Sequence, residues 1–310
     1  MKQKSKVKWF KYGPDIWKPN DAGHILDSIP NGIYIPSYHN DYGTYLQQTT
    51  LETDELLTLP SSIHEKVLNI IDRFIKSKEL YKQYGFLYKR GILLHSKPGN
   101  GKSCLINIIC NKIESQKDVL IIPINNIDQF EFFTLLINKI REAEPNKLLL
   151  VIMEDIDVLA NSHKESTLLN TLDGINNIDN IIYLATTNYI EHLKARIINR
   201  PSRFDDRIYI DSLNKLDREY ILTKKVDKDI LKNYDIENIL NKTEDYNFSY
   251  FIEFIKSVFI LGYSIEETCE KLSIMKDFKK ESSNNYEKEN NSTIGFKIYS
   301  SNSPLHKGLK

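Results

Sequence analysis

The segment 91–113 constrains the fold more than any other part of the 310-residue chain. It reads GILLH, then SKPGNGKS, then CLINIICNKI: a short apolar run, a turn with two glycines, and a stretch with helical spacing. Gly99 and Gly101 allow backbone torsion angles that are closed to other residues, so successive N–H groups can point at one anion. A helix N-terminus directly after the turn adds its positive end. The order of strand, glycine loop and helix is therefore typical of a phosphate-binding loop.

Within this loop, two side chains have specific expected roles. Lys102 reaches the β- and γ-phosphates of a nucleotide, and the hydroxyl of Ser103 binds Mg²⁺. The usual pattern, GxxxxGK followed by Ser or Thr, starts with glycine, whereas Ser96 stands at that position here. A chance polar turn is the alternative, and the flanking strand and helix argue against it. The predicted nucleotide contacts in the loop are Ser96, Lys97, Pro98, Gly99, Asn100, Gly101, Lys102, Ser103 and Cys104.

Short apolar runs alternate with helical periods through the middle of the chain. This alternation predicts an α/β fold, with a parallel sheet covered by helices on both faces. The predicted strands are Ile92–Leu94, Val119–Ile122, Leu148–Met153, Ile181–Ala185 and Ile208–Ile210. From about residue 214 only helical patterns follow. We therefore expect an N-terminal region with a β-hairpin over 1–60, an α/β core over 61–213, a helical domain over 214–280 and a polar, disordered tail over 281–310.

Polar side chains follow two of the predicted strands. Leu148–Met153 ends in Glu154 and Asp155, and carboxylates at this edge of a parallel sheet suit Mg²⁺ binding and activation of water. The run Ile181–Ala185 is followed by two threonines and Asn188. A neutral amide at this edge can orient a water beside a γ-phosphate without adding negative charge.

Arg200 and Arg203 lie three residues apart in the sequence NRPSRFD. A solvated surface turn is one interpretation of this pair. Guanidinium groups are always charged and forked, and they also suit stabilisation of the charge that develops in phosphoryl transfer, including transfer in a neighbouring subunit. Both interpretations are open at this point.

The motifs PGNGKS, LLLVIMEDID, LLNTLDGI, ATTN and RPSRFD, in this order, resemble the AAA ATPase family. The resemblance implies a P-loop NTPase core with a five-stranded parallel sheet flanked by helices, and a small all-α lid domain. It implies Walker A, Walker B, sensor 1 and arginine-finger roles for residues already named. The implied catalytic residues are Lys102, Glu154, Asp155, Asn188, Arg200 and Arg203, and the implied metal ligands are Ser103 and Glu154.

Two features distinguish the chain from most of this family. The acidic pair reads Glu-Asp where most members have Asp-Glu, which resembles the branch of the mitochondrial Rieske-protein translocase and its soluble phage and bacterial relatives. Slow hydrolysis with Asp155 as the catalytic base is a hypothesis. The signature Ser-Gly-Ala-Asp of the helical domain is replaced by residues 248–251. Tyr84 and Gly85 are the candidates for contact with adenine.

The resemblance implies Mg²⁺-dependent hydrolysis of ATP by a homo-oligomeric ring, with six copies, coupled to remodelling of an unidentified protein client. Two alternatives are open. A nucleotide-gated switch or scaffold would bind ATP and barely hydrolyse it. A DNA-associated motor or loader would use the basic and aromatic residues of 1–20 to bind nucleic acid.

Composition excludes some other classes. The 42 Lys and Arg residues balance 42 Asp and Glu residues, which argues against a general nucleic-acid coat or a membrane-surface protein. The longest apolar run, Leu148–Met153, is far shorter than the roughly 20 residues of a membrane span. Cys104, Cys110 and Cys269 lack paired spacing and indicate reduced thiols. We expect a soluble protein of the cytoplasm, or of the host cytoplasm if phage-encoded, with no membrane partner.

Overall fold

The computed structural model describes residues 8–11, 15–20, 28–41, 43–50, 57–60, 62–116, 118–160, 165–173 and 178–276. The chain divides into two compact units, Met1–Ile252 and Glu253–Lys310. This division lies well beyond the boundary between residues 213 and 214 that the sequence predicts. The predicted tail over 281–310 lies outside the described residues.

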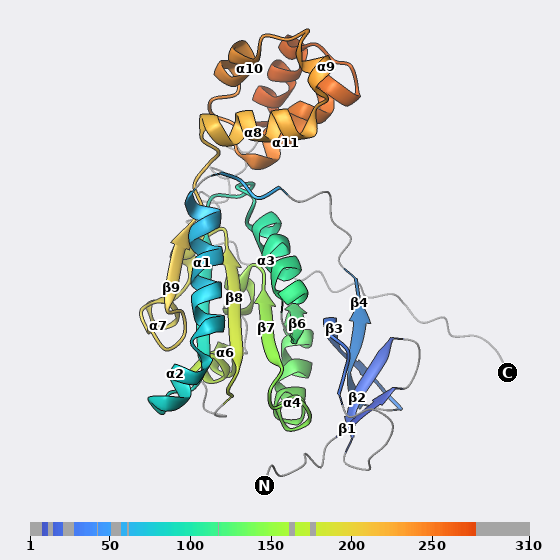
Figure 1. Ribbon diagram of the computed structural model, residues 1–310, viewed down its shortest axis with the longest axis vertical. Helices are drawn as coiled ribbons and strands as arrows, with labels where there is room; N and C mark the ends of the chain where they lie inside the picture. Colours follow the sequence, from blue (N-terminus) through green and yellow to red (C-terminus); the bar gives the residue numbers. More distant parts are fainter. Residues whose placement is uncertain are drawn as a thin grey trace, which may run out of the picture. The chain divides into compact units, whose positions relative to one another are not determined.

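Nine strands of the described residues form one sheet, in the order β1-β2-β4-β3-β6-β7-β8-β5-β9 (Figure 1). Strands β5 to β9 are mutually parallel, which confirms the expected α/β fold. The same sheet also contains four N-terminal strands beyond the five parallel strands that the sequence predicts. The strands are β1 (Lys8–Lys11), β2 (Ile16–Asn20), β3 (Gly32–His39), β4 (Gly43–Thr49), β5 (Lys89–His95), β6 (Val119–Ile124), β7 (Leu148–Met153), β8 (Ile181–Thr187) and β9 (Asp206–Tyr209).

The N-terminal strands enlarge the sheet because β3 pairs with β6 in parallel, through the partners Gly32–Leu120 and Ile33–Ile121. Strand β4 then pairs antiparallel with β3, and β2 and β1 continue outward, also antiparallel. Strands β3 and β4 form a hairpin in the segment where the sequence predicts one. The hairpin is thus part of the same sheet as the phosphate-binding loop.

Buried charged side chains that follow α4 (Ile127–Ala143) form hydrogen bonds with the segment that precedes β3. Glu144 is buried, and its Oε1 accepts a hydrogen bond of 2.6 Å from the backbone N–H of Ile29. Lys147 is also buried, and its Nζ donates to the Ile29 carbonyl at 2.8 Å and to Asp118 at 2.6 Å. These contacts satisfy two charged groups that would otherwise be costly to bury.

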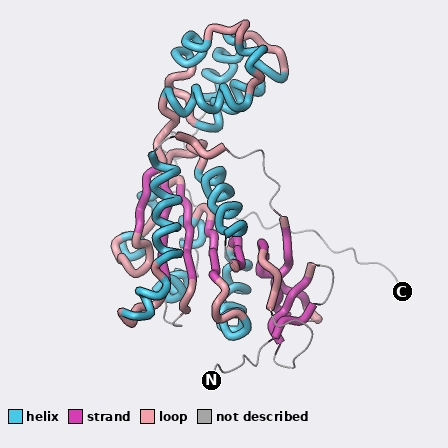
Figure 2. Tube along the Cα trace, viewed as in Figure 1, coloured by secondary structure: helices cyan, strands magenta, loops and turns pink. Residues whose placement is uncertain are grey.

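Helices cover both faces of the sheet (Figure 1 and Figure 2). Val67 and Leu105 belong to the core on one face, and Phe133 and Leu168 belong to the core on the other. Alternate side chains of β7 enter the two cores, so this strand is apolar at every position. The helices of the α/β part are α1 (Ser62–Lys76), α2 (Lys78–Gln83), α3 (Lys102–Gln116), α4, α5 (Ile156–Ala160), α6 (Glu165–Asp173) and α7 (Ala195–Ile198).

Residues 214–276, all of which the structure describes, form helices and connecting loops (Figure 2). None of the helices placed by the structure has the length and apolar content needed to cross a bilayer. The helices that precede a π-helical turn at Lys256–Ile260 are α8 (Lys215–Lys225), α9 (Lys228–Leu231), α10 (Ile236–Lys242) and α11 (Phe248–Ile255).

Candidate active site

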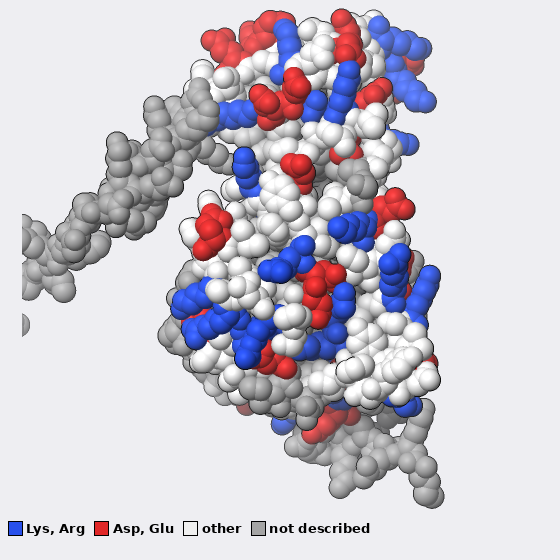
Figure 3. Space-filling view, turned by 90° about the vertical axis from the view of Figure 1, so that its left-hand side faces the viewer, with Lys and Arg blue, Asp and Glu red and all other residues white. Residues whose placement is uncertain are grey.

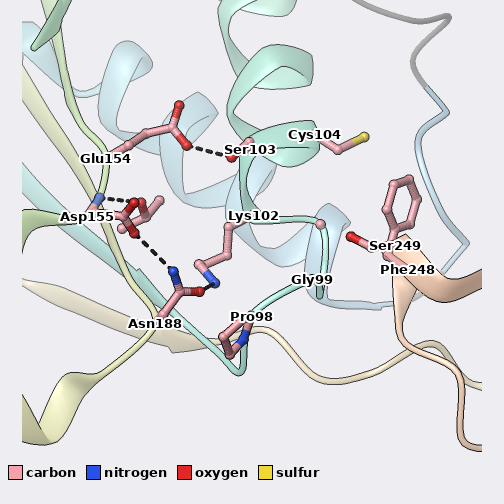
Figure 4. Close-up of a pocket in the computed structure, with 12 residues that line it drawn as sticks. Pro98, Gly99, Lys102, Ser103, Cys104, Glu154, Asp155, Asn188, Phe248 and Ser249 are labelled. Carbon is pink, nitrogen blue, oxygen red and sulfur yellow. Dashed lines mark hydrogen bonds between the residues drawn. The ribbon is translucent and has the colours of Figure 1, made fainter. Parts of the chain in front are cut away.

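A cavity of about 330 Å³ opens at the carboxyl ends of β5, β7 and β8 (Figure 4). These strands are neighbours in the sheet, so the residues that follow them meet at one edge. The loop between β5 and α3 contributes Pro98, Gly99, Gly101, Lys102, Ser103 and Cys104, the sheet edge contributes Glu154, Asp155, Thr186 and Asn188, and the start of α11 contributes Phe248 and Ser249.

Both glycines of the loop are required by its shape. Gly99 has φ of +85° and Gly101 has φ of +84°, in the left-handed region that favours glycine. A Cβ atom on Gly99 would lie 2.6 Å from Nδ2 of Asn247, and one on Gly101 would lie 3.3 Å from the ring of Phe248. A side chain at Gly99 would displace the amide of Asn247, and one at Gly101 would press on the ring of Phe248.

Lys102 begins α3 and points along the sheet edge toward Asn188 (Figure 4). Its Nζ donates to Asn188 Oδ1 at 2.6 Å and to Ser96 Oγ at 2.9 Å. Burial lowers the pKa of Lys102, and the carboxylates of Asp155 and Glu154 oppose this shift. Ser96, at the position where the usual pattern has glycine, thus supplies an acceptor for the buried ammonium group.

Ser103 and Glu154 form the second contact across the cavity. The hydroxyl of Ser103 donates to Glu154 Oε2 at 2.5 Å (Figure 4). Mg²⁺ prefers oxygen ligands, and proteins commonly hold it with one or two side-chain oxygens together with phosphate oxygens and water. A hydroxyl and a carboxylate side by side at the mouth of a glycine loop fit this requirement.

Asp155 has an unusual backbone conformation. Its φ is +47°, which is uncommon for a residue with a side chain. Its backbone N–H donates to Thr186 Oγ1 at 3.2 Å, and its Oδ1 accepts a hydrogen bond of 3.0 Å from Asn188 Nδ2. Backbone strain of this kind is concentrated at functional sites. The contacts join Asp155, Asn188 and Lys102 in one chain of hydrogen bonds.

Neither arginine of the predicted pair lines the cavity. Arg203 is buried, and its guanidinium makes two hydrogen bonds to Asp173, of 2.7 and 2.6 Å, and one to the Arg196 carbonyl. The side chain of Arg200 is 63% exposed, and its Nη1 lies 3.2 Å from the same carboxylate. Of the two arginines, only Arg200 is accessible to a neighbouring molecule.

Figure 3 views the side of the molecule that lies on the left of Figure 1, where β9 and α7 are drawn. Lys and Arg side chains gather there, with Asp and Glu side chains among them. Ion pairs explain part of this mixture, because Glu165 accepts hydrogen bonds from Lys194 and Arg196. The carboxylates of α6 therefore hold the segment that carries Arg200.

The predicted adenine contacts, Tyr84 and Gly85, do not line the cavity. Tyr84 and Gly85 follow α2 and precede β5, whereas the loop follows β5. Because β5 has seven residues, its two ends are separated by roughly 20 Å. Tyr84 and Gly85 are therefore at the opposite edge of the sheet from the cavity.

Three predicted loop contacts do not line the cavity: Ser96, which contacts Lys102, and two others. Lys97 is exposed, and Asn100 is buried with its Nδ2 donating to the Ile210 carbonyl at 3.1 Å. The sequence-based site residues also omit Thr186, Phe248 and Ser249. Asn before an apolar helix signals an N-cap at Asn247, but no local pattern shows that this helix start meets a loop some 150 residues earlier.

Comparisons with known proteins agree with this geometry. Residues 92–212 match the model of the "ATPase family associated with various cellular activities (AAA)". The chain is 29% identical over 208 residues to the "Probable mitochondrial chaperone BCS1-A" of Dictyostelium discoideum, covering 62% of this chain and 48% of that protein. It is 30% identical over 240 residues to "Protein HYPER-SENSITIVITY-RELATED 4" of Arabidopsis thaliana, covering 64% of this chain and 40% of that protein.

A third relative is the "ATP-dependent zinc metalloprotease FtsH" of Marinobacter nauticus, 26% identical over 223 residues, covering 65% of this chain and 34% of that protein. The chain thus spans about half or less of the length of these three relatives. The matched region includes the glycine loop, both acidic residues of the cavity, Asn188 and the two arginines.

Proposed function

Because residues 92–212 belong to the AAA ATPase family, we propose that this chain is a Mg²⁺-dependent ATPase that remodels a macromolecular client. One observation carries the proposal. Lys102, Asn188 and Asp155 are joined by hydrogen bonds in the same cavity as the Ser103–Glu154 pair. This arrangement provides a phosphate ligand, a proton acceptor and an oxygen pair for a divalent ion within one site.

ATP binds with its phosphates against the glycine loop. The loop N–H groups and Lys102 donate to phosphate oxygens, and Lys102 exchanges its contacts with Asn188 and Ser96 for contacts with the β- and γ-phosphates. Phe248 and Ser249 replace Tyr84 and Gly85 as candidates for contact with the base, since both line the cavity. The ring of Phe248 offers a surface on which a nucleobase stacks.

Ser103 and Glu154 are the protein ligands for Mg²⁺ in this proposal. When bound, the ion neutralises charge on the β- and γ-phosphate oxygens. Asp155 is the second residue of the acidic pair, and its carboxylate accepts a hydrogen bond from Asn188. The adjacent carboxylates are therefore available for different tasks, Glu154 for the ion and Asp155 for the proton.

Hydrolysis proceeds by in-line attack of water. Asn188 orients the water, and Asp155 accepts its proton as the oxygen bonds to the γ-phosphorus. The bond between the γ-phosphorus and the bridging oxygen breaks, and ADP leaves with the electron pair. Asp155 has one methylene group fewer than the glutamate usual at this position, and slow turnover is part of the proposal.

The site is completed by a second copy of the chain. Arg200 is exposed and lies outside its own cavity, which supports a role at the phosphates of a neighbour. AAA ATPases typically form oligomers, and we propose a homo-hexameric ring. One relative is named as a chaperone, which favours a protein client. The three cysteines are free thiols, which favours the cytoplasm.

Steady-state phosphate release with Mg²⁺ and ATP tests the activity. Lys102→Ala should lower turnover about 10- to 100-fold or more, because a charged hydrogen bond to phosphate is lost. Lys112→Ala is the matched control, since Lys112 lies on the same helix and pairs with Asp72 at 2.7 Å outside the cavity. Equal turnover in both variants contradicts the proposal.

The same measurement separates the alternatives. Tight binding of ATP with phosphate release no faster than the uncatalysed background supports a nucleotide-gated switch. A DNA-associated motor requires binding to DNA that weakens as salt increases and that depends on residues 1–20. Filter binding at two salt concentrations, with and without these residues, decides that case.

A further inference from the structure

The outer side of the phosphate-binding loop is held by residues at the start of α11. Nδ2 of Asn247 donates to the Pro98 carbonyl at 3.1 Å. The backbone N–H of Ser249 donates to the Gly99 carbonyl at 3.0 Å. Figure 4 shows Ser249 and Phe248 on the side of the cavity where Gly99 lies. Two consecutive carbonyl groups of the loop thus have partners from one distant segment.

These contacts determine where two loop N–H groups point. In a trans peptide the C=O and N–H groups point in opposite directions, and the described residues contain no cis peptide bond. The Pro98 carbonyl shares a peptide plane with the N–H of Gly99, and the Gly99 carbonyl shares one with the N–H of Asn100. Holding both carbonyls on α11 therefore turns both N–H groups away from that helix. N–H groups aimed in this way are the anion ligands of a glycine loop.

Asn247 has a second role in the same place. Its Oδ1 accepts a hydrogen bond of 2.9 Å from the backbone N–H of Tyr250, which is the capping bond of α11. One side-chain amide therefore joins the first turn of the helix to the loop. The fit is close, because a Cβ atom on Gly99 would lie 2.6 Å from Nδ2 of Asn247.

We propose that Asn247 is a positioning residue that aims the loop N–H groups at the nucleotide phosphates and couples phosphate binding to the order of the first turn of α11. This inference rests on the proposed function, because it requires a nucleotide in the cavity. Asn247 itself does not contact the phosphates. It acts through the Pro98 carbonyl, with Ser249 supporting the next peptide through its backbone.

Calorimetry with Mg²⁺ and ADP tests the role of Asn247. Asn247→Ala should raise the Kd about 5- to 15-fold, the effect of losing one hydrogen bond that preorganises the loop. Asn214→Ala is the matched control, because Asn214 caps α8 with the same type of bond, to the N–H of Asp217 at 2.8 Å. Asn214→Ala should lower the melting temperature about as much as Asn247→Ala does, because each variant loses one helix cap. It should leave the Kd for ADP within twofold of the wild-type value.

Asn247→Ser separates positioning from simple loss of a helix cap. Serine is a good N-cap, but its shorter side chain does not reach the Pro98 carbonyl. This variant should keep most of the melting temperature and still bind ADP about 5-fold more weakly. It also decides the matter if Asn247→Ala does not fold.

Hydrogen exchange gives a readout that a purely structural role does not affect. The N–H of Phe251 donates to the backbone carbonyl of Asn247, a bond that every variant can keep. ADP should slow exchange at Phe251 in the wild-type protein and slow it less in Asn247→Ala. If both Asn247 variants bind ADP within twofold of the wild type, the positioning role is overturned while the ATPase proposal stands. If the wild-type protein binds no nucleotide, the proposed function itself fails.

Discussion

The places of Asp155 and Asn188 in the site can be predicted from their positions after two strands. Asp155 lies two residues after β7 and Asn188 directly follows β8, so the sequence places both at the carboxyl edge of the sheet. Lys102 and Ser103 are fixed there by the loop after β5. The sequence therefore predicts that these four side chains lie at the same edge of the sheet. It does not predict that Arg203 is buried on Asp173, because that contact depends on packing between segments 30 residues apart.

Asp155→Asn should retain ATP and lose turnover. Asparagine tolerates the left-handed φ of +47°, so the backbone keeps its shape, whereas the amide cannot accept the proton of water. We expect phosphate release to fall about 10²- to 10⁴-fold and the Kd for ATP to stay within about threefold. Phosphate release and calorimetry measure the two quantities. Unchanged turnover would instead make Glu154 the base.

Loss of Arg200 should mainly lower turnover, whereas loss of Arg203 should mainly lower the stability of the fold. Arg200→Ala should leave the free energy of unfolding within about 1 kcal/mol, since its ion pair is exposed, and lower turnover on the order of 10³-fold. Arg203→Ala should cost about 3 kcal/mol of stability, because its removal takes away the main partner of a largely buried carboxylate. Urea unfolding and phosphate release separate these effects.

Mixing tests whether Arg200 acts on a neighbour. Arg200→Ala protein mixed with Asp155→Asn protein should regain part of the activity, because some sites then combine an intact Asp155 with an intact Arg200. No recovery at any mixing ratio argues that the site is complete within one chain.

Helix α6 acts as a clamp on the chain between β8 and β9. Glu165 near its start holds Lys194 and Arg196, and Asp173 at its end holds Arg200 and Arg203. The motif LLNTLDGI overlaps α6, but the role of the helix carboxylates is visible only from their contacts with the arginine segment. These contacts fix the position of the segment from which the exposed side chain of Arg200 projects into solvent.

This clamp should weaken in acid. The hydrogen bonds from Arg203 hold the pKa of Asp173 below its usual range. A group whose pKa is lower in the folded state stabilises the protein above its unfolded pKa, near 4, and this stabilisation is lost as pH falls through the folded value. Asp173→Asn should be less stable than wild type by about 1–3 kcal/mol at pH 7. Urea unfolding at pH 7, 5 and 3 should show this difference narrowing below about pH 4; a constant difference contradicts the assignment.

At the scale of the whole molecule, the sheet extends further than local sequence patterns indicate. Strands β5 to β8 are predictable because their side chains enter cores on both faces, which produces continuous apolar runs. The pairing of β3 with β6 joins segments more than 80 residues apart, and it has no local signal. The same limit applies to the contact of Phe248 with the glycine loop.

Removal of residues 1–50 should therefore damage the α/β core. Tyr34 and Leu46 are fully buried in the same core as the helices on one face, and Glu144 and Lys147 would lose their partner Ile29. We expect loss of cooperative unfolding or aggregation, measured by calorimetry and light scattering. Removal of residues 1–20 alone should change the melting temperature by only a few degrees, because β2 has two paired positions with β4. An unchanged melting temperature after removal of 1–50 contradicts this view.

The pairing of β3 with β6 also has a mechanical consequence. Backbone hydrogen bonds connect β1, through β2, β4, β3 and β6, to β7, the strand that Glu154 follows. Tension applied along β3 loads its parallel partner β6 in shear, so the backbone bonds at the two paired positions share the force. Under the proposed function, a pull on the N-terminal strands is transmitted through the sheet to the edge that carries Glu154, and a shift of that edge on phosphate release is transmitted back to β3.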